Sequence, residues 1–156
     1  MRRKRSYKRI HRPDSVYDSV VVGRFINYIM QGGKKIVAEK VFYDAMDIIA
    51  KKTKKDPMVI FEKALENVTP SMEVKSRRIG GANYQIPMEV RPERKFLLAS
   101  GWIIEAAKTK RGKPIAERLA DEILSAESNE GEAIKKKQNV HRMAEANRAF
   151  AHFANR

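Results

Sequence analysis

Hydrophobic residues recur at helical spacing along most of this 156-residue chain. They fall three and four positions apart, a period that is typical of amphipathic helices. Six segments show this spacing, at about 19–30, 35–50, 57–69, 92–107, 115–124 and 132–150. Glycine or proline separates most of the segments, and Asp56-Pro57 combines an N-cap acceptor with proline at the first helical position. The pattern therefore predicts a mainly α protein, a bundle of six helices.

Between residues 72 and 91 the hydrophobic period drops from 3.6 to 2, which predicts a β-hairpin between the third and fourth helices. We expect a turn at 80–83. That turn would put Met72, Val74, Ser76 and Arg78 on one face with Tyr84, Ile86, Met88 and Val90, and Glu73, Lys75, Arg77, Gln85 and Glu89 on the other. Pro87 cannot donate to a central ladder, so the strands should form an isolated ribbon with a packed base and a projecting, charged tip.

Charge and composition narrow the class of protein. Against 19 Asp and Glu the chain carries 33 Lys and Arg, a net charge of +14 at pH 7, and such an excess usually serves a polyanionic partner. The absence of cysteine excludes disulfides and Cys-based metal sites and suits the cytoplasm. No apolar run approaches the ~20 residues of a membrane span, so we expect no membrane association. At this length we expect a single domain over 1–156.

No arrangement of residues predicts catalysis, a metal site or a cofactor. His141 and His152 would lie roughly 16 Å apart along one helix, too far to share a metal, and His11 is remote in sequence. The run from Gly32 to Lys35 lacks the glycine and hydroxyl positions of a Walker loop. It is either a weak site for one phosphate or a glycine helix stop followed by solvated lysines. We therefore expect no enzyme.

Basic residues gather in the N-terminal arm, in loops and on the hairpin, where a phosphate backbone could reach them. The first twelve residues form the arm, which we expect to be disordered in the free protein. The candidate RNA-binding residues are Arg2, Arg3, Lys4, Arg5, Lys8, Arg9, Arg12, Lys34, Lys35, Lys75, Arg77, Arg78, Arg91, Arg94, Lys95, Lys110, Arg111 and Lys113. Lys135, Lys136 and Lys137 oppose the dipole of the last helix, so we expect them to serve something other than stability.

The hairpin favours RNA over DNA as the polyanion. No segment has the pattern of a DNA recognition helix, whereas Arg78, Asn83, Tyr84 and Gln85 near the ribbon's end suit an irregular RNA surface. Tyr84 either stacks on a base or packs across the strands. The alternatives are an architectural DNA protein, a small hydrolase that uses His141 or Glu145, and a membrane-surface protein.

Three stretches of sequence carry a family resemblance. They are ENVTPSMEVKSRRIGGANYQIPMEVRP over 66–92, WIIEAA from Trp102, and VHRMAEANRAFAH from Val140. These closely resemble bacterial small-subunit ribosomal protein seven, and the match runs in order from about residue 13 to 153. The resemblance implies six helices with a long β-ribbon. Gly101 departs from the family's pattern, because a longer residue is usual at that helical site.

The resemblance also implies a role and partners. Such a protein is a primary binder of small-subunit ribosomal RNA that nucleates assembly of the head domain, and it neighbours small-subunit ribosomal protein eleven. The family's RNA-facing positions fall on the basic residues named above. Gly80, Gly81, Tyr84, Gln85, His141 and Arg142 fall on the side that faces exit-site transfer RNA and the messenger path. Some family members repress their own messenger RNA, and we expect a monomer when the protein is free.

Overall fold

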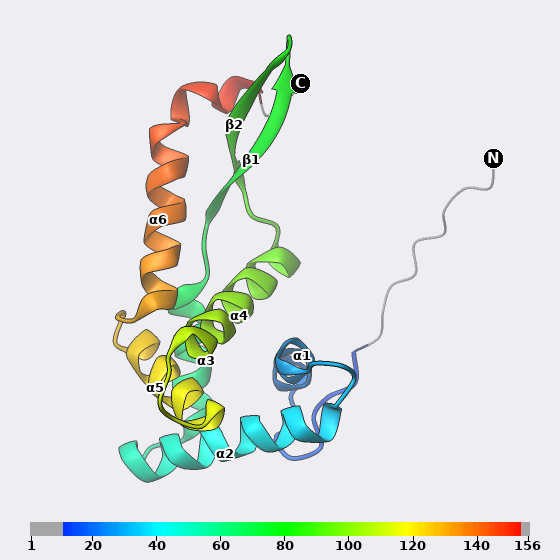
Figure 1. Cartoon of the computed structure of the whole chain (residues 1–156), viewed down its shortest axis with the longest axis vertical. Helices are drawn as coiled ribbons and strands as arrows, with labels where there is room; N and C mark the ends of the chain where they lie inside the picture. Colours follow the sequence, from blue (N-terminus) through cyan, green and yellow to red (C-terminus); the bar gives the residue numbers. More distant parts are fainter. Residues whose placement is uncertain (1–10, 154–156) are drawn as a thin grey trace, which may run out of the picture. The chain divides into compact units, whose positions relative to one another are not determined.

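The computed structural model describes residues 11–153, which form six α-helices, one antiparallel hairpin and a short 3₁₀ helix (Figure 1). In chain order these are α1 Val20–Ile29, α2 Lys35–Thr53, α3 Pro57–Val68, β1 Met72–Ile79, β2 Ala82–Glu89, α4 Pro92–Thr109, α5 Ile115–Glu127, α6 Glu132–Ala146 and η1 Arg148–Phe153. The predicted mainly helical fold, with its hairpin between the third and fourth helices, is confirmed. Within 11–153, no helix is long and apolar enough to cross a membrane.

The chain divides into two compact units, Met1–Lys40 and Val41–Arg156, with the boundary inside α2. In the first unit, the side chain of Asp14 accepts hydrogen bonds from the backbone N–H groups of Val16 and Tyr17, each at 3.1 Å. Residues 12–14 pass close to α1, where a Cβ on Gly23 would lie 2.9 Å from the carbonyl oxygen of Arg12. Only glycine allows that approach. The single domain expected from chain length stays a prediction.

In the second unit, α5 packs against α3 and α4, and α4 also contacts α6. The buried side chains of α3 and α5 include Phe61, Leu119 and Ile123, which lie on the apolar faces of these amphipathic helices. The Asp56 side chain accepts a hydrogen bond from Met58 N at 2.9 Å, and Pro57 follows it as the first helical residue. The predicted start of α3 is therefore confirmed, together with its cause.

The register of the hairpin corrects the predicted faces. Ile79 pairs with Ala82, so the turn consists of Gly80 and Gly81 alone. Their φ angles of +57° and +92° are those that a tight two-residue hairpin turn requires of both central residues. Arg77 therefore lies opposite Tyr84, and the predicted pairing of faces is wrong by one residue. The actual faces are Glu73, Lys75, Arg77, Tyr84, Ile86 and Met88 on one side, and Met72, Val74, Ser76, Arg78, Asn83, Gln85 and Glu89 on the other.

The ribbon runs beside α6, and η1 lies against its outer part (Figure 1). As predicted, the sheet of the described chain has only two strands, and its base is buried at Ile86 and Val90. The last helix ends earlier than expected, at Ala146, because Asn147 follows it as the C-cap. The side-chain amide of Asn147 donates to Met143 O at 2.7 Å. The chain then turns into η1, which crosses to the ribbon.

Candidate nucleic-acid interface

The ribbon carries three exposed cations, and the register spreads them over both of its faces. Lys75 and Arg77 share one face and Arg78 lies on the other. Within 11–153, Lys75 and Arg78 have no carboxylate partner. Arg77 differs from them because its Nη1 donates to the carbonyl oxygen of Phe153 at 3.2 Å. Lys75 and Arg78 are therefore the two ribbon cations that an external anion would find free.

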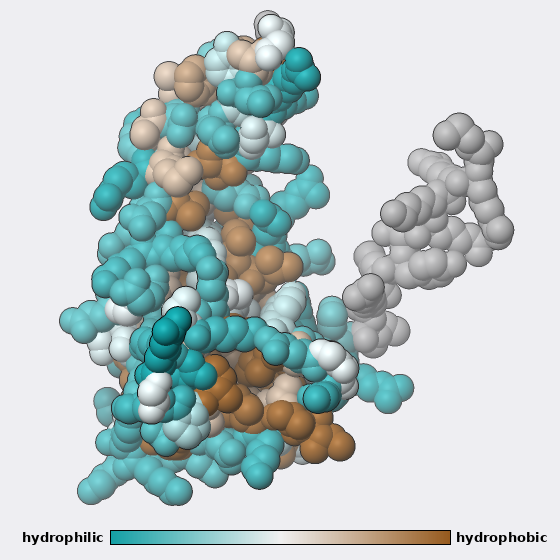
Figure 2. Space-filling model, viewed as in Figure 1, coloured by the Kyte–Doolittle hydropathy of each residue, from teal (hydrophilic) through white to brown (hydrophobic). Residues whose placement is uncertain are grey.

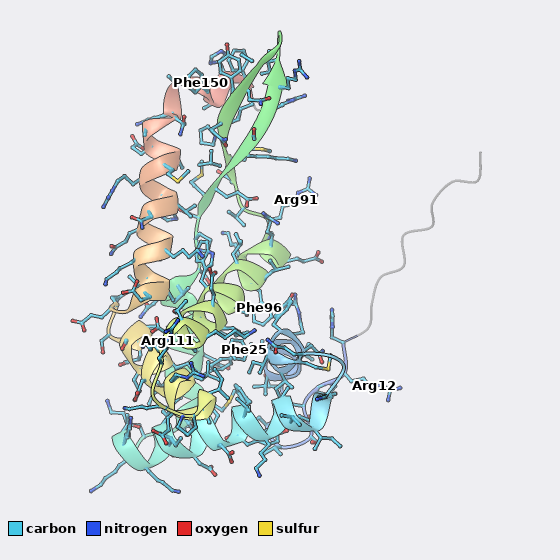
Figure 3. All side chains as sticks on the ribbon, viewed as in Figure 1. Arg12, Phe25, Arg91, Phe96, Arg111 and Phe150 are labelled. Atoms are coloured by element: carbon cyan, nitrogen blue, oxygen red, sulfur yellow. The ribbon has the colours of Figure 1, made fainter. Side chains whose placement is uncertain are left out.

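At the exit of the ribbon, one of the three predicted RNA-binding residues has a carboxylate partner and two have none. Arg91 is exposed and extends from the start of α4 into open space, on the side of the ribbon away from α6 (Figure 3). Lys95 is half-buried, and neither residue has a carboxylate partner in the described chain. Arg94, in contrast, places its Nε 2.7 Å from both carboxylate oxygens of Glu73. That pair ties α4 to β1, so Arg94 has a structural role.

The cations of the loop between α4 and α5 also divide into residues with a carboxylate partner and a residue without one. Lys110 Nζ lies 2.6 Å from Oε2 of Glu122, whose side chain is fully buried, and Lys113 Nζ lies 3.3 Å from Asp121. Arg111, between these two lysines, is exposed and without a carboxylate partner in the described chain (Figure 3). Of the predicted RNA-binding residues in this loop, Arg111 is thus the one whose charge is fully available.

In the first unit, the turn between α1 and α2 holds two of the predicted cations. α1 ends at Ile29 with Met30 as its C-cap, so the glycines do not themselves stop the helix; Gly32 and Gly33, with φ angles of +58° and +74°, form the turn that follows. Lys34 is exposed and has no described acid partner, whereas Lys35 lies 3.7 Å from Glu39. Arg12 is also exposed. The rest of the predicted arm's cations, Arg2, Arg3, Lys4, Arg5, Lys8 and Arg9, lie outside the described residues, as does the prediction that this arm is disordered.

The three consecutive lysines of α6 all have partners inside the protein. Lys135 Nζ lies 2.6 Å from Glu132, and Lys136 Nζ lies 2.5 Å from Glu105 of α4. Lys137 Nζ donates to the carbonyl oxygen of Asn67 at 2.6 Å, in the last turn of α3, where a cation is favourable. Burial lowers the pKa of Lys137. The expectation that these lysines serve something other than stability stays a prediction, although each of them has a partner within the protein.

The acids of residues 121–132 pair with lysines of several elements. Asp121 faces Lys52 at 2.5 Å as well as Lys113, and the hydrogen bond from Lys52 is the main cause of its lowered pKa. Glu127 pairs with Lys63, which lowers the pKa of that carboxyl. Glu122 also accepts a hydrogen bond from Ala133 N at 3.0 Å, at the start of α6. This acidic stretch therefore neutralises cations of the helical part and reaches none of those on the ribbon.

The residues predicted to face transfer and messenger RNA are only partly exposed. Gly80, Gly81 and Gln85 are exposed at the ribbon tip, and Arg142 is exposed on α6. Tyr84 is half-buried, with its ring centre 5.2 Å from that of Phe150 and 5.5 Å from that of Phe153. It packs on η1, a contact that neither sequence alternative included.

His141 is also engaged within the protein. Its Nε2 accepts a hydrogen bond from Ser71 N at 3.1 Å. Burial, and to a lesser extent the charge of Lys137, lowers the pKa of His141, which keeps the ring neutral and able to accept. Glu145 pairs with Arg148 at 3.3 Å, and no hydrogen bond or ion pair joins it to His141 within 11–153. Within 11–153 no group of three His, Asp or Glu side chains could hold a metal.

Sequence reasoning missed the residues that join the ribbon to the end of the chain. Phe150 and Phe153 stand three positions apart after α6, a signal consistent with a continued helix, and nothing in the sequence assigns them to a partner 66 or more residues away. Hydrophilic side chains cover most of the visible face of α6 and the ribbon, with hydrophobic ones where the two meet (Figure 2). The surface available to an anion is therefore formed by the free cations and not by the aromatic contact.

Comparison with known proteins gives a consistent result. Residues 1–148 match the family model described as ribosomal protein S7p/S5e. A relative from Thermotoga maritima named small ribosomal subunit protein uS7 is 55% identical over 153 residues, which cover 98% of this chain and 99% of the relative. The protein of the same name from Dictyoglomus thermophilum is 57% identical over 141 residues, 90% of each chain.

Proposed function

The chain belongs to the ribosomal protein S7p/S5e family, and on that premise we propose that it binds small-subunit ribosomal RNA through the cations that its own acids leave unpaired. Members of this family are structural proteins of the small ribosomal subunit and not enzymes, and the chain is a cytoplasmic component of that subunit. What remains to be proposed is the surface that contacts RNA and the task that this surface performs.

The division of the cations carries the proposal. Among the predicted RNA-binding residues, the exposed ones whose side chains have no described partner are Arg12, Lys34, Lys75, Arg78, Arg91 and Arg111. They lie ahead of α1, at the α1–α2 turn, on the ribbon, at its exit and in the α4–α5 loop. Separate cations held out by a helical scaffold suit the many separate phosphates of a folded RNA.

The finer role follows from the separation of these groups. A rigid protein that contacts several RNA segments removes much of their orientational freedom, so later components meet a prepared surface. We therefore propose that the protein is a primary binder that nucleates assembly of the head domain. The ribbon tip and Arg142 would face exit-site transfer RNA and the messenger path, with small-subunit ribosomal protein eleven as a neighbour. Binding to its own messenger as a repressor would use the same cations.

The test compares free cations with paired ones at equal net charge. One variant carries Lys75→Gln, Arg78→Gln and Arg91→Gln, and the matched control carries Lys63→Gln, Lys135→Gln and Lys136→Gln. We expect the first to bind head-domain ribosomal RNA at least about tenfold more weakly near 0.15 M salt, since it loses three phosphate contacts. The control should stay within about twofold of wild type, because its lysines face carboxylates.

Two results would contradict the proposal. Equal losses in the two variants would mean that total charge, and not the position of the free cations, determines binding. Competition by duplex DNA as effective as that by the ribosomal RNA would favour the architectural DNA alternative. Filter binding, with unfolding in urea measured on each variant, separates lost affinity from lost stability.

A further inference from the structure

The ribbon is fastened to the end of the chain at two places, and the first is its base. Ser71 lies just before β1, and its backbone N–H donates to His141 Nε2 at 3.1 Å. The next backbone contact, Val90 N to Ser71 O at 3.1 Å, closes the base of the hairpin. Because His141 lies in the middle of α6, this bond fixes the point at which the ribbon leaves the helical part.

The second place is near the tip. The Tyr84 ring lies against Phe150 and Phe153, with tilted geometry and centre separations in the range of favourable aromatic pairs. Arg77, which is directly opposite Tyr84 in the ladder, donates to Phe153 O at 3.2 Å. Phe150 stands on η1 beside the outer part of the ribbon (Figure 3). One residue of each strand thus contacts the same six-residue 3₁₀ helix.

Between these two places the ribbon and α6 do not fill the space that separates them. A groove of about 410 Å³ lies there, with walls that include Met72 and Pro87 of the hairpin and Ala144 and Ala151 of α6 and η1. A two-stranded hairpin is at best marginally stable in water and has little resistance to bending. The contacts at its two ends therefore add to the Arg94–Glu73 pair and the packing on α6 in setting the direction of the ribbon.

We propose that η1 and His141 form a strut that sets the direction of the ribbon before RNA binds, with His141, Phe150 and Phe153 as its positioning residues. This inference rests on the proposed function, because it concerns how Lys75, Arg78 and the tip are presented to RNA. A ribbon already held in the bound direction loses less conformational freedom on binding. It also accounts for Arg77, whose guanidinium serves the strut as well as the charge of the ribbon.

The first part of the test needs no RNA. The chain has no cysteine, so Ala82→Cys at the tip and Gln138→Cys on α6 give two unique sites for spin labels in the full-length protein. The distance distribution between them should be narrow in the wild-type background. With Phe150→Ala and Phe153→Ala it should become at least about twofold wider, since the outer support is lost.

Four further variants keep this result interpretable. Phe150→Tyr with Phe153→Tyr preserves the aromatic contact and should restore the narrow distribution, whereas general unfolding would not be reversed. Val59→Ala with Leu97→Ala removes two exposed apolar side chains elsewhere and should leave the width unchanged. His141→Ala should broaden the distribution, and His141→Gln, whose amide oxygen can accept from Ser71 N, should restore it.

The second part reads out RNA. A cleavage reagent on the cysteine at position 82 should cut ribosomal RNA at a few positions in wild type and at many in the Phe150→Ala, Phe153→Ala variant, with affinity reduced about threefold to tenfold. An unchanged width in that variant, or a broad distribution already in wild type, would overturn the strut. If wild type and all variants failed to bind RNA, the proposed function would be overturned. The widths of the spin-label distance distributions would still decide whether the strut exists.

Discussion

The junction of α4, α5 and α6 and the ribbon contain the same kinds of residue in opposite arrangements. At the junction several lysines meet an oxygen of the protein, as Lys110 meets Glu122 and Lys137 meets the carbonyl of Asn67. On the ribbon, Glu73 lies on the same face as Lys75 but pairs with Arg94. Lys75 and Arg78 are exposed to solvent. If the proposed function holds, the difference teaches that the cations available to RNA are those that the fold leaves without an acid partner.

The largest expected effect tests the junction itself. Glu122→Ala would leave Lys110 without its partner and Ala133 N without its acceptor, at a side chain with 0% exposure. We expect the free energy of unfolding to fall by about 3 kcal/mol, as is usual when one member of a buried pair is removed. Urea unfolding measures this. Glu130→Ala, an exposed acid of the same stretch, should cost less than about 0.5 kcal/mol, and equal losses would remove the distinction.

The next prediction compares neighbouring cations of one loop. Arg111→Gln removes a free charge, so RNA affinity should fall about fivefold and the log–log salt slope should lessen by about 0.8. Lys113→Gln removes a charge that already faces Asp121 at 3.3 Å, and both effects should be less than half as large. Binding titrations between about 0.05 and 0.3 M potassium chloride measure both quantities. A larger effect at Lys113 would show that internal pairing does not decide which cations bind.

A third variant separates stability from binding. Gly101 is exposed within α4, and a Cβ at that position would meet nothing within 4 Å. Gly101→Ala should therefore raise the free energy of unfolding by about 0.5 to 1 kcal/mol, because alanine restricts the unfolded chain and favours the helix. RNA affinity should not change. If affinity rose together with stability, the scaffold and the interface could not be treated as separate regions.

The smallest effect concerns pH at the base of the ribbon. The pKa of His141 lies below its unfolded value of 6.5, chiefly through burial, so below that pH the unfolded chain binds more protons than the folded one. The contribution of His141 to stability is complete above 6.5 and is lost as the pH falls through its lowered pKa. The difference in unfolding free energy between wild type and His141→Gln should follow this course. A difference that grew on acidification would contradict it.

The sequence is a good guide to the helices and a poor one to long-range pairing. Asp56-Pro57 predicts the start of α3 because its cause is local, and the buried residues of α5 follow from a period of 3.6. The hairpin is predicted from alternation, but its faces are not, because Gly80-Gly81 can form either the two-residue turn or the centre of a longer one. One residue of difference exchanges every facing pair.

The candidate site shows the same limit. The spacing of basic residues identifies the ribbon, the α4–α5 loop and the α1–α2 turn, yet it cannot tell Arg111 from Lys110 or Lys75 from Arg94. Their partners lie on other elements, as Glu105 does for Lys136, 31 residues away in sequence. Only the packing of the helices brings such residues together, so the division between free and paired cations has no signal in one sequence.

The contact between Arg77 and Phe153 spans 76 residues of chain. At a synthesis rate of about 5 to 20 residues per second, the strands of the ribbon are made roughly 4 to 15 s before the aromatic residues that touch them. The nascent chain thus carries the strands of the ribbon without this support until Phe150 and Phe153 have been made. A product truncated before Phe150 would keep Lys75, Arg77 and Arg78 but lack the contact that holds the outer part of the ribbon.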